Sequence, residues 1–123
     1  MDLAVIKTER ISSVVWTYDL NSSKRIDDEK WYKMEKSLSG LIDSVIKEKD
    51  KITEQRVKDL FAQTVMELED ILGVSQLNDG GIYYYGGLNC LFAEIMEALR
   101  FPTKKGKYYW VSNFVYGLDF VDD

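Results

Sequence analysis

Two apolar stripes between residues 28 and 72 set the strongest limit on how this chain can fold. Over residues 28–47 the stripe consists of Trp31, Met34, Leu38, Leu41, Ile42, Val45 and Ile46, and over residues 53–72 it consists of Val57, Leu60, Phe61, Val65, Leu68, Ile71 and Leu72. Intervals of three and four residues place each stripe on one face of an α-helix. The sequence therefore predicts two amphipathic helices, with Thr53 as the N-cap of the second.

A third, shorter helix is expected over residues 88–100. Its apolar residues have the same helical spacing, and they are Leu88, Leu91, Phe92, Ile95 and Leu99. Pro102 follows this segment, and proline prevents a helix from continuing.

Segments nearer the two ends of the chain are rich in β-branched and aromatic residues, which favour strands. These segments are "LAVIK" (3–7), "SVVWTY" (13–18) and "YYWVSNFVY" (108–116). At the period of two that a strand has, Val14, Trp16 and Tyr18 share one face. We therefore expect one α+β domain over residues 1–123. Its small antiparallel or mixed sheet is built from the N- and C-terminal strands, and about three central helices pack on it.

The composition is that of a single compact domain. A chain of 123 residues with 46% hydrophobic residues can form one core. No apolar run reaches the roughly 18 residues of a membrane span. Asp2 stands where a signal peptide carries positive charge, and a single cysteine, Cys90, fits a reducing compartment. We expect a cytoplasmic protein without a membrane segment.

The chain contains no histidine, which removes the usual general base and the commonest metal ligand. The sequence also lacks a P-loop and the G-x-G-x-x-G pattern of dinucleotide sites. Cys90 lies on the same helix face as Glu94 and Glu97, and neighbouring carboxylates disfavour the reactive thiolate. We therefore expect no enzyme activity, no metal site and no cofactor.

Charge is distributed unevenly along the sequence. Residues 1–60 hold 12 Lys/Arg and 12 Asp/Glu, whereas residues 61–123 hold 4 and 9. From Asp59 through Leu99 there is no basic residue at all. Such a segment produces a local negative field, which attracts basic surfaces and repels nucleic acid phosphates. A solvated acidic face that serves solubility alone is the alternative interpretation.

The stretch "GGIYYYGG" (80–87) lies inside this acidic segment. Its tyrosines either fill the core as a short strand or act as contact residues, for which tyrosine is well suited. In the second case they bind a partner together with nearby carboxylates. The predicted partner-binding set is Glu67, Asp70, Asp79, Tyr83, Tyr84, Tyr85, Glu94 and Glu97.

Three functional interpretations remain open. The first is an inhibitor of the immunity-protein or antitoxin type, which neutralises a basic toxin such as a nuclease through the acidic, tyrosine-rich surface. Small bacterial immunity proteins and antitoxins are similar to this chain in size and charge. The second is a phage-type anti-defence protein that mimics DNA. The third is a dimeric adaptor or secretion-chaperone-like protein, so the chain is expected to be a monomer or a homodimer.

Overall fold

The computed structural model describes residues 2–22, 25–77, 87–101 and 111–116. These residues form six α-helices, which are α1 (Leu3–Glu9), α2 (Ile11–Asn21), α3 (Asp28–Glu48), α4 (Glu54–Leu72), α5 (Leu88–Ala98) and α6 (Val111–Tyr116). None of the described residues lies in a β-strand. The predicted α+β fold with a sheet is therefore wrong, and the protein is helical.

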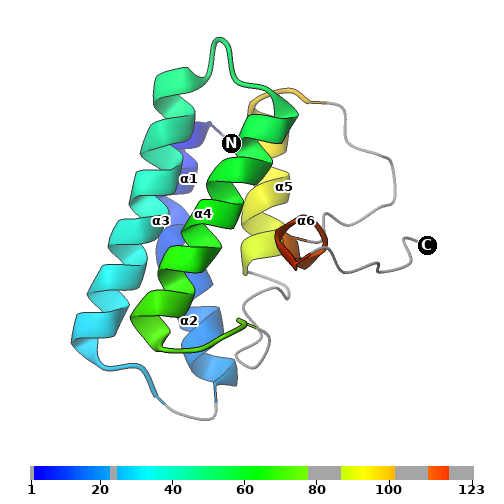
Figure 1. Ribbon diagram of the computed structural model, residues 1–123. Coiled ribbons are helices and arrows are strands. Elements are labelled where there is room, and N and C mark those ends of the chain that lie inside the picture. The colour runs from blue at the N-terminus through cyan, green and yellow to red at the C-terminus, as the bar shows by residue number, and fades with distance from the viewer. Residues whose placement is uncertain (1, 23–24, 78–86, 102–110, 117–123) are drawn as a thin grey trace.

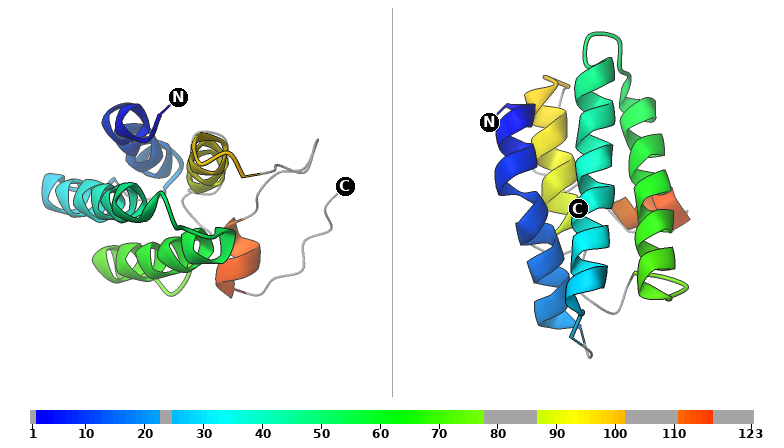
Figure 2. Two further views of the ribbon diagram at one scale, coloured as in Figure 1. Left: turned by 90° about the horizontal axis from the view of Figure 1, so that it is seen from above. Right: turned by 90° about the vertical axis from the view of Figure 1, so that its left-hand side faces the viewer.

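The longer helices lie side by side with alternating directions (Figures 1 and 2). α1 and α2 run in one direction, α3 runs in the opposite direction, α4 runs parallel to α1 and α2, and α5 runs parallel to α3 (Figure 1). α5 lies beside α1 (Figure 2). α3 packs against both α2 and α4, whereas α5 packs against α1. The short α6 lies across α4 and α5. This order resembles an up-down-up-down bundle in which α1 and α2 act as one bent helix.

Two predicted strands are in fact the first two helices. The "LAVIK" segment lies in α1, and "SVVWTY" lies in α2. Asp2 caps α1 by accepting a hydrogen bond from the Val5 N–H (2.9 Å). At the bend, the Arg10 N–H still donates to the Ile6 carbonyl and the Val14 N–H donates to the Arg10 carbonyl. Backbone hydrogen bonding is therefore helical on both sides of the bend.

The burial pattern of α2 explains this error. Val14 and Tyr18 are buried, but Trp16 between them is 55% exposed. The buried apolar residues of the two helices recur at helical intervals, and they are Leu3, Ile6, Ile11, Val14, Val15 and Tyr18. A window of six residues is too short to separate this period from alternation. Burial against α3 outweighs the strand preference of the β-branched residues, because that preference is weak and depends on context.

The predicted C-terminal strand is also wrong where the structure describes it. Residues 111–116 form α6, and residues 108–110 lie outside the described residues. The Val111 N–H at the start of α6 donates to Asn89 Oδ1 of α5 (2.8 Å), while Val111 itself is buried. α6 is thus held by contacts with other helices, which local alternation of residue types does not reveal.

The three central helices are confirmed. Asp27 caps α3 and Thr53 caps α4, each through a side-chain oxygen that accepts a backbone N–H three residues later. Gly73 ends α4 with a φ of 68°, a left-handed conformation that glycine adopts without strain. In α4 the apolar spacing, the N-cap and the glycine stop signal all agree, and in α3 the apolar spacing agrees with the N-cap.

An aromatic series crosses the core. The ring of Phe61 in α4 meets Phe92 in α5 edge-on, with centroids 5.0 Å apart. Phe92 also contacts Phe114 of α6 at 5.1 Å. Phe61 and Phe92 are fully buried. Phe92 therefore joins α4, α5 and α6. In the described ranges, no helix combines the length and apolar character that crossing a bilayer requires.

Replacing Phe92 with alanine should lower the free energy of unfolding by about 3–5 kcal/mol, because it leaves a cavity where three helices meet. Tyr32→Ala is the matched control, since Tyr32 is 66% exposed. Urea denaturation followed by circular dichroism measures both variants. Equal losses in the two variants would contradict this packing.

An ion pair closes the α3–α4 hairpin and makes it sensitive to pH. Arg56 donates to both carboxylate oxygens of Glu48, each at 3.0 Å. This hydrogen bonding, helped by the attraction between the charges, lowers the pKa of Glu48 below its ordinary value. A lowered folded-state pKa stabilises the protein above the unfolded pKa of about 4.3, and this contribution is lost as pH falls through the folded-state value.

Arg56→Met should therefore raise the pKa of Glu48 towards its ordinary value, and stability should fall less steeply on acidification below about pH 4.5. An NMR titration of the Glu48 carboxyl carbon measures the pKa directly. The same Glu48 pKa in both proteins would show that the ion pair does not persist in solution.

Candidate protein-binding surface

The predicted partner-binding residues fall into separate groups. Glu67 and Asp70 are exposed on α4, while Glu94 and Glu97 lie on α5. Asp79 and Tyr83, Tyr84 and Tyr85 lie outside the described residues. The "GGIYYYGG" segment is described only at Gly87, the buried N-cap of α5.

α4 presents a ridge to solvent on the side away from its buried stripe. We call the exposed residues Asp59, Gln63, Met66 and Asp70 the α4 ridge. Their spacing of three and four residues aligns them along the helix. Met66 is 67% exposed and is one of four large apolar side chains that lie largely in solvent among the described residues. The ridge therefore combines an apolar side chain with carboxylates on either side of it.

A groove runs along one side of the ridge, between α3 and α4. Its volume is about 580 Å³, and its lining includes Leu41 and Leu60 at the base. Lys33 and Lys36 line it on α3, whereas Gln63, Glu67 and Asp70 line it on α4. Ser37 on α3 donates a hydrogen bond to Glu67, which fixes the level of the two helices. The groove thus has a basic wall and an acidic wall.

A smaller hollow lies on the other side of the ridge. Met66, Glu69, Asp70, Gly73 and Val74 line its volume of about 410 Å³. Nearby, the Tyr116 hydroxyl donates to Glu69 Oε2 (2.9 Å) and accepts the Leu77 N–H (3.1 Å). Glu69 is therefore engaged in holding α6, whereas Asp70 faces both the hollow and the groove.

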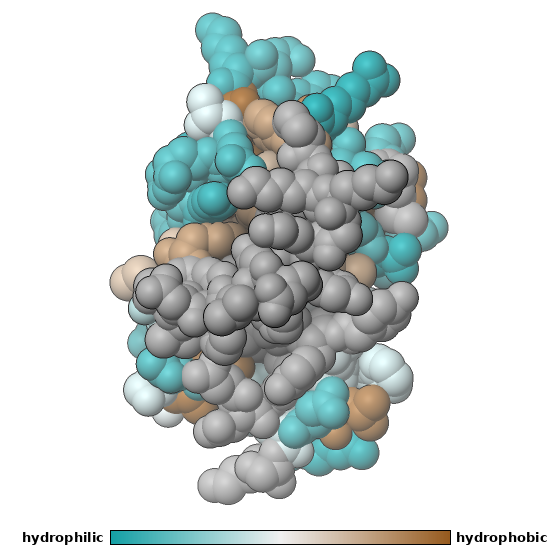
Figure 3. All heavy atoms as spheres, turned by 90° about the vertical axis from the view of Figure 1, so that its right-hand side faces the viewer, coloured by the Kyte–Doolittle hydropathy of each residue, from teal (hydrophilic) through white to brown (hydrophobic). Residues whose placement is uncertain are grey.

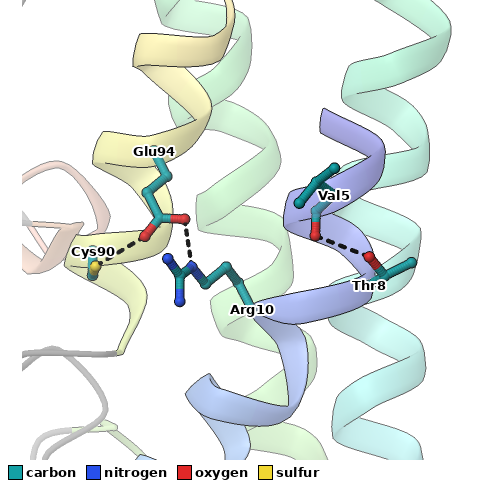
Figure 4. A network of polar contacts seen from close by, with 5 residues as sticks. All are labelled: Val5, Thr8, Arg10, Cys90 and Glu94. Atoms are coloured by element: carbon teal, nitrogen blue, oxygen red, sulfur yellow. Dashed lines mark hydrogen bonds and ion pairs between the residues drawn. The ribbon is translucent and has the colours of Figure 1, made fainter. Parts of the chain in front are cut away.

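The α5 carboxylates have a different environment. On the side of the molecule that carries α5 and α6, the described residues that are visible are mostly hydrophilic, with smaller apolar areas among them (Figure 3). Glu94 accepts hydrogen bonds from Arg10 Nε (2.9 Å) and Cys90 Sγ (3.4 Å), as Figure 4 shows. The hydrogen bond and charge of Glu94 raise the pKa of Arg10 above its ordinary value. Glu97 is exposed.

Figure 4 also shows that this network belongs to the α1–α5 contact. Arg10 extends from the bend between α1 and α2 towards Glu94, while Thr8 turns back and donates to the Val5 carbonyl (3.1 Å). Glu94 therefore ties α5 to α1, and Glu67 bonds across the α3–α4 contact. The two predicted carboxylate groups lie at different helix–helix contacts. Among the predicted residues that the structure describes, Asp70 belongs to the α4 ridge and Glu67 adjoins it, whereas Glu94 and Glu97 lie on α5.

Met66 was missed by the sequence reasoning, although the helical period that places Glu67 and Asp70 outside also places Met66 outside. The opposition of Lys33 and Lys36 to the α4 carboxylates was missed as well. That relation depends on how α3 and α4 are aligned, which no local pattern gives. The described residues contain no group of three or more His, Cys, Asp or Glu arranged to hold a metal ion.

Comparisons with known proteins give no assignment. No family model, no curated protein and no solved structure matches this chain.

Proposed function

We propose that this chain is a non-catalytic, cytoplasmic inhibitor of the immunity-protein or antitoxin type. It binds a basic protein partner, such as a nuclease toxin, and neutralises it. The observation that carries the proposal is the α4 ridge, where an exposed methionine lies between carboxylates on a helix that has no basic residue from Asp59 onward.

The two kinds of side chain on the ridge have distinct roles in this proposal. Asp59 and Asp70, with Glu67 beside them, attract a cationic surface over a distance and speed its approach. Met66 is flexible and polarisable, so it can fill an apolar depression on the partner. Lys33 and Lys36 reduce the negative field over the groove. The partner is therefore expected to approach from the side of Asp59 and Met66.

The first test concerns association. Affinity capture from the native organism supplies the partner, and the purified pair is then studied by surface plasmon resonance. The variant Glu67→Lys/Asp70→Lys should associate at least tenfold more slowly, with a flatter salt dependence and a small change in dissociation rate.

The variant Glu9→Lys/Asp50→Lys is the control, because it changes the net charge equally at exposed positions away from the ridge. Association that slows equally in both variants would leave net charge as the whole explanation. Unchanged association in the Glu67→Lys/Asp70→Lys variant would contradict the proposal.

The second test concerns the anchor. Met66→Ala should weaken binding by about 1 kcal/mol or more, chiefly through faster dissociation, and should leave the melting temperature unchanged. Leu20→Ala is the control, because Leu20 is also exposed but lies on α2. A partner that binds Met66→Ala as tightly as the native chain does not use the ridge as its anchor.

A further inference from the structure

We propose that the α3–α4 face binds a second copy of this chain, so that the free protein is a symmetric homodimer. The groove between these helices carries the observation, because its two walls have opposite charge. Lys33 and Lys36 form the basic wall on α3, and Glu67 and Asp70 form the acidic wall on α4. A surface that carries positive and negative charges side by side can be complementary to the same surface on a second copy.

The two walls lie at the same height along the bundle. The hydrogen bond from Ser37 to Glu67 aligns one turn of α3 with one turn of α4. Because the helices run in opposite directions, Lys33 and Lys36 precede Ser37 at the same end of the groove where Asp70 follows Glu67 (Figure 1). Lys33 also contacts Glu29 (3.0 Å), but exposed pairs of this kind are weak and exchange readily.

A two-fold axis parallel to the helices makes these walls meet. Such an axis places α3 of one copy against α4 of the other and preserves height along the bundle. Lys33 and Lys36 of each copy then face Glu67 and Asp70 of the other, and this contact occurs twice. A two-fold axis perpendicular to the helices would instead reverse the second copy along the bundle. The charged end of the groove in one copy would then face the end near Ser44 and Leu60 in the other, where the lining residues carry no charge.

Gly40 gives independent support for a close approach. It lies in the interior of α3 and lines the groove, and a Cβ at this position would meet no heavy atom within 4 Å. Neither packing within one copy nor a left-handed backbone requires glycine there, and glycine is unfavourable inside a helix. A second helix that lies close to the groove supplies the missing reason.

The dimer does not rest on the proposed function, since it needs no other protein. The two proposals share Glu67 and Asp70, however. If both hold, a basic partner and the second copy compete for these carboxylates, and partner binding favours dissociation of the dimer.

Sedimentation velocity over a concentration series at low salt tests the dimer. The native chain should become dimeric as concentration rises. The variants Lys33→Glu/Lys36→Glu and Glu67→Lys/Asp70→Lys should each remain monomeric, because like charges then face each other. An equimolar mixture of the two should regain a dimer, since each altered wall meets its opposite. A native chain that stays monomeric at millimolar concentration, or a mixture that does not associate, overturns the proposal.

Gly40→Leu separates steric contact from charge. It should weaken dimerisation at least tenfold and leave the melting temperature of the monomer unchanged or higher. Ala4→Leu is the matched control, because Ala4 is an exposed small residue on α1 that does not line the groove, and this variant should dimerise like the native chain. A Gly40→Leu chain that dimerises as strongly as the native one overturns this interface.

Discussion

Burial of Phe92 is the contact on which the arrangement of the bundle depends. Its ring meets Phe61 of α4 edge-on and also packs on Phe114 of α6. α5 is in turn tied to α1 by the ion pair between Glu94 and Arg10. The buried aromatic contact contributes more to holding α5 in the bundle than the ion pair does, because a partly exposed ion pair contributes little. Because α5 and α6 pack on the inner side of the bundle, the side of the α3–α4 hairpin that carries the groove faces solvent.

The part of the fold that could be predicted from sequence is the part with long periodic stripes. In α3 and α4 about five helical turns repeat the same pattern, so chance alternation cannot imitate it. In α2, residues 13–18 include five β-branched or aromatic residues, and their pattern fits a period of two as well as a helical one. The exposure of Trp16 decides between them, and exposure is a property of the assembled bundle.

The candidate surface was predictable to a similar degree. At 100° per residue, the apolar stripe of residues 53–72 leaves Asp59, Glu67 and Asp70 on the opposite face of the helix, and all three are exposed. The pairing of Glu94 with Arg10, 84 residues away, could not be read from local patterns. The same applies to the level of the α3 lysines relative to the α4 carboxylates. These relations come from tertiary packing, and they decide which carboxylates can meet a partner.

Tertiary burial makes a helix of a segment with strand-like composition. Backbone ¹³Cα chemical shifts of residues 11–21 in the intact protein report the conformation of this segment. We expect shifts displaced downfield from random-coil values throughout it, as in an α-helix. Upfield displacement across Val14–Tyr18 would indicate a strand and would contradict the bundle.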